Sequence, residues 1–258
     1  MHGHQPRRRF GQNFIADAHY IQRIVGAIDP KPGERIVEIG PGLAALTDAL
    51  ITRAGRITAI EIDRDLAARL RERYDDGQLE LVEGDALEVD FSALGTDLRI
   101  VGNLPYNISS PMLFHLAESD SHLRDAHVML QKEVVDRMSA RPGTPAYGRL
   151  TVMLQARFDV QRLFVVPPGA FRPPPKVDSA VARLLPLRER APVVDDFGLF
   201  GRVVGAAFSQ RRKTLRNALS KLCDAAAIEA AGVRPDARAE QIEVADFVRL
   251  ANHLAASQ

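Results

Sequence analysis

The chain has 258 residues, of which 46% are hydrophobic and 26% are charged, which is typical of a globular protein with a sizeable core. Its formal net charge of +1 excludes a uniformly basic surface, and its single cysteine, Cys223, excludes an internal disulfide. No apolar run approaches the length of a membrane span, and the N-terminus lacks the apolar part of a secretory signal, so we expect a cytoplasmic protein with no membrane partner.

The first half of the chain alternates between helical and strand-like segments. Asp17 is placed to cap a helix whose apolar residues fall on one face. The predicted strands are 35–39, 56–62, 79–83, 98–101 and 126–131. Predicted helices cover 43–53 and 64–74, and a further helix is predicted to begin at Ser110-Pro111. Because strands that alternate with helices form βαβ units, we expect a mostly parallel sheet covered by helices on both faces.

The pattern changes after about residue 151. We predict later strands at 152–158 and 179–187, separated by the proline-rich segment 167–176, which favours an extended, stiff conformation. Residues 186–192 resemble a linker, and the segments beyond it are predicted helices at 197–208, 213–222, 225–230 and 245–255. We therefore expect two domains, one at 1–187 that contains the sheet and a small helical one at 192–258.

A glycine motif follows the first long strand. Gly40 and Gly42 allow a sharp turn and a close approach to a ligand, and the next helix directs backbone N–H groups at the same gap. The next strand ends at Glu61, where a carboxylate can accept hydrogen bonds from both hydroxyls of a ribose. Asp85 follows the third strand and can accept a hydrogen bond from an adenine amino group. These residues predict a cofactor that contains adenosine.

Two features favour S-adenosylmethionine over NAD as that cofactor. Glu38 places an acid just before the glycines, and an acid-lined pocket suits a cationic sulfonium but repels a pyrophosphate. The segment Asn103-Leu104-Pro105-Tyr106 follows another strand, at the sheet edge where open α/β sheets bind ligands. Its amide, its exposed carbonyl and its aromatic ring suit a planar base with an amino group, such as adenine.

Eight segments occur in an order that resembles a known family, the small-subunit (16S) ribosomal RNA adenine dimethyltransferases (KsgA family). The segments are 9–15, 38–43, 61–63, 84–86, 103–111, 146–150, 171–179 and 211–217. The resemblance covers nearly the whole chain. It implies an α/β class I methyltransferase, with a Rossmann-like, mostly parallel sheet that has one late antiparallel strand, and a small all-helical C-terminal domain. It also implies a monomer that dimethylates two adjacent adenines in a hairpin loop near the 3′ end of small-subunit rRNA.

The resemblance implies roles for individual residues as well. The cofactor contacts fall on Asn13, Ile15, Gly40, Glu61, Asp85 and Asn103, and the glycine motif adds Gly42. The side-chain oxygen of Asn103 and the backbone carbonyl of Leu104 would accept the two N–H bonds of the adenine amine and so direct its lone pair at the methyl group. Tyr106 would stack on one face of the base and Phe171 would cover the other. This chemistry requires no metal.

One position departs from the family pattern, because the family usually has glycine where this chain has Ala44. The added methyl group is small and lies near the start of a helix. We expect tighter packing at this position and no loss of cofactor binding.

Basic residues gather near the two ends of the chain. We predict that the RNA backbone lies along Arg7, Arg8, Arg9, Arg149, Arg211, Arg212, Lys213 and Arg216. A solvated helix face is the alternative interpretation of such runs. An adenine held in a pocket must come from a loop or be flipped out of its stack.

The sequence leaves three other functions open. The first is that of the erythromycin-resistance methylases, which modify one adenine of large-subunit rRNA, and the forms of segments 103–111 and 211–217 argue against it. The second is a non-catalytic ribosome-assembly or transcription factor on the same fold. Loss of cofactor binding is disfavoured by the presence of Gly40, Glu61, Asp85 and Asn103. The third is an NAD-dependent dehydrogenase.

Overall fold

The structure is a computed structural model, and it describes residues 13–210 and 212–257. The chain divides into two compact units. The first runs to Val135 and also contains Gln161–Pro186, and the second contains Asp136–Val160 and the chain from Leu187 onward. Within the described residues, no helix is long and apolar enough to cross a membrane.

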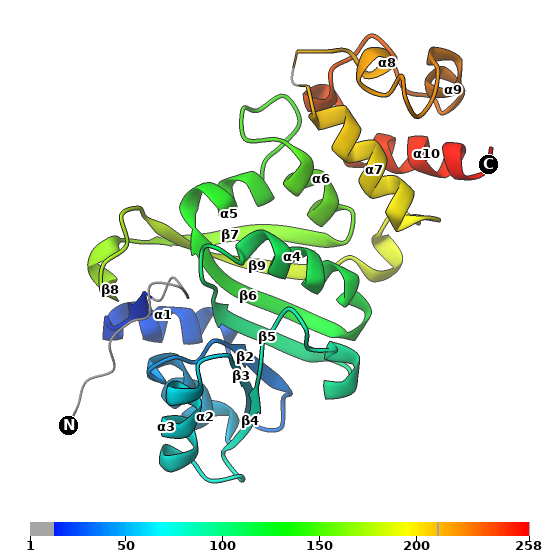
Figure 1. Cartoon of the computed structure of the whole chain (residues 1–258). Coiled ribbons are helices and arrows are strands. Elements are labelled where there is room, and N and C mark those ends of the chain that lie inside the picture. Colours follow the sequence, from blue (N-terminus) through cyan, green and yellow to red (C-terminus); the bar gives the residue numbers. More distant parts are fainter. Residues whose placement is uncertain (1–12, 211, 258) are drawn as a thin grey trace. The chain divides into compact units, whose positions relative to one another are not determined.

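A sheet of seven strands has the order β4-β3-β2-β5-β6-β9-β7 (Figure 1). The strands are β2 (Ile36–Ile39), β3 (Ile57–Glu61), β4 (Leu79–Glu83), β5 (Leu98–Asn103), β6 (Leu123–Gln131), β7 (Phe158–Val166) and β9 (Ser179–Pro186). Strands β2 to β6 pair in parallel, and β9 pairs antiparallel with β6. The predicted sheet, mostly parallel with one late antiparallel strand, is confirmed. A further small sheet joins β1 (Phe14–Ile15) to β8 (Phe171–Arg172).

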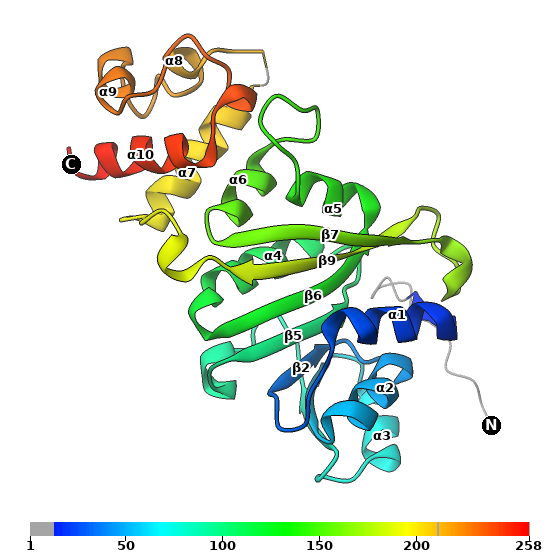
Figure 2. The same ribbon diagram turned by 180° about the vertical axis from the view of Figure 1, so that it is seen from behind.

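Helices cover both faces of the large sheet, as predicted. The first unit contains α1 (Ala18–Ile28), α2 (Ala45–Ala54), α3 (Arg64–Arg73) and α4 (Ser109–Glu118). Figures 1 and 2, which view the sheet from opposite sides, show α4 on one face and α1 on the other. Helix α1 begins where expected, because the Asp17 carboxylate accepts hydrogen bonds from the backbone N–H groups of His19 and Tyr20.

The parallel register brings the ends of four strands to one edge of the sheet. Ile39 at the end of β2 lies beside Ile60 of β3 and Gly102 of β5, and Glu61 lies beside Glu83 of β4. The loops that follow these strands therefore share the edge at which open α/β sheets bind ligands.

Ala44, the departure from the family pattern, lies directly before α2. Its backbone is in the left-handed region, with φ 68° and ψ 19°, where glycine is the least strained residue. Its methyl group is buried and belongs to the same core cluster as Leu46 and Leu50. This burial agrees with the expected tight packing, and the expected retention of cofactor binding stays a prediction.

The second unit has a helical core of its own. Its helices are α6 (Arg149–Gln155), α7 (Phe197–Phe208), α8 (Leu215–Ala218), α9 (Ala225–Ala230) and α10 (Val244–Ala255), and α5 (Lys132–Met138) precedes them. Short 3-10 helices lie in the first unit at Phe91–Leu94, Asp120–His122 and Pro168–Ala170, and in the second at Arg188–Arg190 and Ala239–Gln241. Residues 136–160, which we had assigned to the first domain, belong to the second unit because Tyr147 and Val152 pack in one core with Phe200 and Phe247.

One predicted strand is wrong. Most of the segment 152–158 is not extended, because helix α6 runs to Gln155 and strand β7 begins at Phe158. The β-branched Thr151 and Val152 favour a strand locally, but both are buried on the inner face of a helix. Val152 lies in the core that surrounds α7, so tertiary packing outweighs local propensity here. The helix predicted at 213–222 is also shorter, since α8 covers Leu215–Ala218.

Candidate active site

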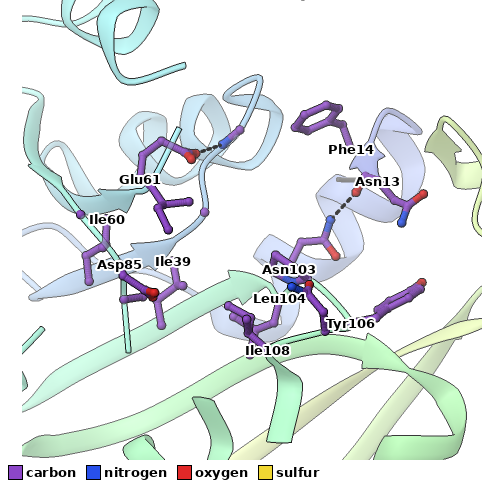
Figure 3. A pocket seen from close by; sticks show the side chains of 17 residues that line it. Asn13, Phe14, Ile39, Ile60, Glu61, Asp85, Asn103, Leu104, Tyr106 and Ile108 are labelled. Carbon is purple, nitrogen blue, oxygen red and sulfur yellow. Dashed lines mark hydrogen bonds between the residues drawn. The ribbon is translucent and has the colours of Figure 1, made fainter. Parts of the chain in front are cut away.

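A cavity of about 310 Å³ opens in the first unit at the carboxyl ends of β2, β3, β4 and β5 (Figure 3). Eight of the predicted site residues line it: Asn13, Gly40, Gly42, Glu61, Asp85, Asn103, Leu104 and Tyr106. Further lining residues include Phe14, Ile39, Ile60, Ile62, Pro105 and Ile108. The cavity thus has an apolar body with a few polar groups, as small-molecule sites usually do.

Glu61 is fixed against the glycine loop. Its side chain, 4% exposed, accepts hydrogen bonds from the backbone N–H of Gly42 at 3.1 Å and of Asp63 at 2.9 Å. Burial raises the pKa of Glu61, while these two N–H groups oppose the rise. A carboxylate held in this way at the end of β3 can also accept hydrogen bonds from the two hydroxyls of a ribose.

Asp85 lies on the same edge, in the loop after β4. Its Oδ1 accepts a hydrogen bond from the backbone N–H of Leu87 at 2.9 Å, which fixes the direction of the side chain. A carboxylate has acceptor capacity beyond a single bond, so Asp85 can also receive the amino group of an adenine.

Asn103 is oriented by the N-terminal arm. Its Nδ2 donates a hydrogen bond to the backbone carbonyl of Asn13 at 2.7 Å, and Figure 3 shows its oxygen on the other side of the amide. Because Nδ2 is used in this bond, Oδ1 is the atom that can accept a hydrogen bond from a group in the cavity. The next peptide is fixed as well, because the Leu104 N–H donates to the Met129 carbonyl at 3.1 Å.

Tyr106 is anchored by a residue that the sequence analysis missed. Its hydroxyl and the Ser179 Oγ lie 2.8 Å apart, and Ser179 is fully buried at the start of β9. Burial raises the pKa of the Tyr106 phenol, so the ring stays neutral near pH 7. Ser179 lies in the segment 171–179 that carried the family resemblance, but its distance from Tyr106 in the sequence concealed the contact.

Two predicted site residues do not line the cavity. Phe171 is 1% exposed and Ile15 is 6% exposed, and the two face each other where β1 pairs with β8. Both side chains belong to the hydrophobic core of the first unit. In this structure the Phe171 ring is packed inside the fold, and the expectation that it covers a base stays a prediction.

Phe14 also lines the cavity, although no sequence pattern singled it out. A Cβ built on Gly42 would lie 2.7 Å from the Phe14 ring, and Gly42 has a φ of 59°. Glycine is therefore required at this position for two independent reasons, the backbone angle and the close approach of the ring. Phe14 brings the N-terminal arm over the glycine loop.

Replacement of Phe171 tests its role as a core residue. We expect Phe171→Ala to lower the free energy of unfolding by about 3–5 kcal/mol, since it removes a fully buried ring. Denaturant unfolding measures this change, with Phe171→Leu as the control that keeps most of the apolar volume. Loss of methyl transfer with unchanged stability would instead restore the base-covering role.

Glu38 lies behind the glycine loop and does not line the cavity. It is 2% exposed, and its Oε2 accepts a hydrogen bond from the Thr47 hydroxyl at 2.7 Å. Burial raises the pKa of Glu38 to about 8, and the charge of Glu61 adds to the rise. Because Glu38 does not line the cavity and burial favours its protonated form, it does not supply the acidic wall that we inferred for a sulfonium.

The titration of Glu38 makes stability depend on pH. Because its pKa is higher in the folded chain than the ordinary value of 4.5, the folded state holds the proton more tightly. This stabilisation is complete below pH 4.5 and is lost as the pH rises through about 8. We expect wild type to lose on the order of 3–4 kcal/mol relative to Glu38→Gln between pH 5 and pH 8. Urea unfolding of both proteins measures the difference, and parallel pH curves would contradict it.

The predicted RNA-binding residues are distributed between the second unit and the undescribed positions. Arg149, Arg212, Lys213 and Arg216 are exposed in the second unit. Arg7, Arg8, Arg9 and Arg211 lie outside the described residues. Over residues 13–210 and 212–257, no group of three or more His, Cys, Asp or Glu side chains is placed to hold a metal.

Comparison with known families gives one clear match. Residues 3–256 match the family described as ribosomal RNA adenine dimethylase. "Ribosomal RNA small subunit methyltransferase A" of Xanthomonas campestris pv. campestris (strain B100) is 60% identical over 249 residues, which cover 95% of each chain. The protein of the same name from Aromatoleum aromaticum is 57% identical over 256 residues, covering 99% of this chain and 97% of that one.

Solved structures show the same fold. A dimethyladenosine transferase from Plasmodium falciparum superposes with a TM-score of 0.79 at 26% identity, over 92% of this chain and 95% of that chain. The 23S rRNA methyltransferase ErmE superposes with a TM-score of 0.72 at 28% identity, over 94% of this chain and all of that one.

Proposed function

This chain belongs to the ribosomal RNA adenine dimethylase family, and from that premise we propose that it transfers methyl groups from S-adenosylmethionine to the exocyclic amines of adenines in small-subunit rRNA. The family resemblance predicted from the sequence is confirmed. The observation that carries the proposal is the orientation of Asn103, whose amide nitrogen is engaged by Asn13 so that its oxygen can accept an amine.

The polar residues of the cavity suit the groups of S-adenosylmethionine. Glu61 and Asp85 are fixed carboxylates at the ends of β3 and β4, suited to the ribose hydroxyls and the adenine amino group of S-adenosylmethionine. The glycine loop at Gly40 allows close approach of the cofactor, and its neighbour Gly42 is covered by Phe14. When bound, S-adenosylmethionine supplies a methyl group on a positively charged sulfur.

The residues at the end of β5 would prepare the amine for an in-line displacement. The Asn103 oxygen and the Leu104 carbonyl accept its two N–H bonds, which draws the nitrogen toward a tetrahedral geometry and directs its lone pair at the methyl carbon. Bound S-adenosylmethionine would supply the methyl group and would leave as a neutral thioether, so the leaving group needs no acid from the protein. The amine then loses a proton to water. Tyr106, anchored by Ser179, would hold one face of the base.

The finer parts of the proposal concern the substrate and the state of the protein. The targets are two adjacent adenines in a hairpin loop near the 3′ end of small-subunit rRNA, each methylated twice, as the family resemblance implies. A loop base can leave its stack more readily than a paired base, which suits a closed cavity. We also propose that the protein is a cytoplasmic monomer, with the helical domain beyond residue 192 in contact with RNA.

The structural similarity to a 23S rRNA methyltransferase favours one alternative, methylation of large-subunit rRNA. A single experiment separates the two substrates. The protein is incubated with radiolabelled S-adenosylmethionine and either unmethylated small subunits or naked 23S rRNA, and the modified nucleotides are mapped. We expect dimethyladenosine at two neighbouring positions of the small subunit alone, whereas labelling of 23S rRNA alone would overturn the proposal.

A further inference from the structure

A second cavity, of about 790 Å³, lies within the second unit along α7. The basic residues that line it are Arg149, Arg202, Lys213 and Lys221. Polar residues that also line it include Ser209, Gln210, Asn217 and Ser220. None of its lining residues in the described part of the chain is acidic. We call this cavity, with its four cations and the glycines of α7, the α7 groove.

Three glycines of α7 line the α7 groove. Gly198, Gly201 and Gly205 line it, spaced three or four residues apart on one face of α7, while Phe200 and Val204 are buried in the core. Figure 1 locates α7, with α6 and α8 near it in the same unit. Gly198 lies in the first turn of α7, but Gly201 and Gly205 lie in the interior of the helix, where glycine is destabilising compared with alanine, so glycine at these two positions requires a reason.

Packing within the chain does not supply that reason at Gly201 or Gly205. A methyl group on Gly201 would have Met153 Cε as its nearest neighbour at 3.6 Å, and one on Gly205 would have Arg149 Cζ at 3.9 Å. Both distances are ordinary van der Waals contacts, and neither glycine has a positive φ. The missing side chains instead deepen the groove and expose the helix backbone to whatever enters it.

The charge of the α7 groove selects an anionic occupant. Arg202 and Lys221 are exposed, and together with Arg149 and Lys213 they place four positive charges around one concave surface. Such a surface concentrates the positive potential and attracts polyanions. The hydroxyl and amide side chains beside them match the phosphate oxygens and ribose hydroxyls of RNA, which need donors as well as charge.

We propose that the α7 groove binds the sugar–phosphate backbone of the rRNA substrate, and that Arg202 and Lys221 are contact residues in addition to Arg149 and Lys213. The inference rests on the proposed function, because that function makes RNA the polyanion. Contacts to phosphate carry no sequence information, so the groove positions the RNA and leaves the choice of base to the cavity at Asn103. Arg212 and Arg216, although exposed, do not line the groove.

The first test removes charge. In the double variant Arg202→Gln, Lys221→Gln we expect the Kd for protein-free small-subunit rRNA to rise about tenfold at 0.15 M salt, and the slope of log K against log salt to fall by about 1–2. Arg234→Gln, Arg249→Gln is the matched control, since these cations of the same unit pair with Asp236 at 3.3 Å and Asp246 at 2.6 Å. It removes the same charge outside the groove and leaves both values near wild type.

The second test fills part of the α7 groove with added methyl groups. Gly201→Ala, Gly205→Ala adds two methyl groups that the chain itself can accommodate. We expect an equal or higher melting temperature, several-fold weaker RNA binding and an unchanged salt slope. Gly26→Ala is the control, since Gly26 is an exposed glycine of α1 at which an added methyl meets nothing within 4 Å. It should leave RNA binding unaltered.

Three outcomes would overturn the inference. The first is an unchanged affinity and salt slope in the charge variant, and the second is full RNA affinity in the glycine variant. The third is weakened binding to intact subunits without weakened binding to protein-free rRNA. That result would indicate that the groove binds a ribosomal protein. In each case wild type still methylates the small subunit. Failure of the proposed function is different, because wild type would then leave the small subunit unmodified.

Discussion

Asn103→Ala is expected to lower kcat for methyl transfer about 100- to 1000-fold. The substitution removes the oxygen that would accept one N–H bond of the adenine amine, an interaction that matters most in the transition state. Single-turnover assays with saturating cofactor measure the chemical step separately from binding. We expect the Kd for S-adenosylmethionine to change far less than kcat, because in our proposal Glu61 and Asp85 hold the adenosine.

Two further variants separate chemistry from structure at Asn103. Asn103→Asp keeps an acceptor oxygen but loses the N–H that Asn103 donates to the Asn13 carbonyl, so we expect activity between wild type and Asn103→Ala. Asn107→Ala removes an amide of the same kind from the same loop, and we expect nearly full activity. A wild-type kcat in Asn103→Ala would show that the amine is not held by this side chain.

The second large effect is expected at Glu61, where Glu61→Gln should weaken cofactor binding about 10- to 100-fold. The variant keeps the shape of the side chain but loses the negative charge that strengthens hydrogen bonds from ribose hydroxyls. Isothermal titration calorimetry with S-adenosylhomocysteine measures the change without turnover.

The affinity of Glu61→Gln for RNA should stay at the wild-type value. The matched control is Glu80→Gln on the neighbouring strand β4, where the carboxylate is exposed and 3.4 Å from Arg56. We expect wild-type cofactor affinity there. An equal loss of cofactor and RNA binding in Glu61→Gln would contradict the ribose assignment and indicate a general disturbance of the fold.

The sequence predicted the sheet well because its signal is local. Buried parallel strands are short apolar runs, and each of those from β2 to β6 stands out between polar or turn-forming neighbours. The positions of Glu61, Asp85 and Asn103 then follow from topology, since parallel strands present their carboxyl ends at one edge. This is why eight predicted site residues converge on one cavity.

The strand predicted at 152–158 is wrong because the conformation there depends on which surface the segment packs against, and that is a tertiary property. Val152 is buried against α7, a partner that is not near in the sequence, so the local pattern favoured a strand. The burial of Phe171 with Ile15 depends on a distant partner in the same way and could not be predicted from the sequence. Its base-covering role stays a prediction.

The residues that were missed have the same explanation. Phe14 covers the glycine loop from the N-terminal arm, and Ser179 reaches Tyr106 from another strand. The left-handed φ of Gly42 could be anticipated from its place after a strand, but the aromatic ring that also requires a glycine there could not. Contacts of this kind determine the detailed geometry of a site, and they cannot be predicted from a single sequence because the residues are far apart in it.

The most direct test is a structure of the protein with S-adenosylhomocysteine and an RNA hairpin that carries the target adenines. We expect the adenine amine about 3 Å from both the Asn103 Oδ1 and the Leu104 carbonyl oxygen, with its nitrogen facing the sulfur. If the flipped base lies elsewhere, with the Asn103 oxygen directed away from it, the proposed hydrogen bonds from the amine to Asn103 and Leu104 are wrong.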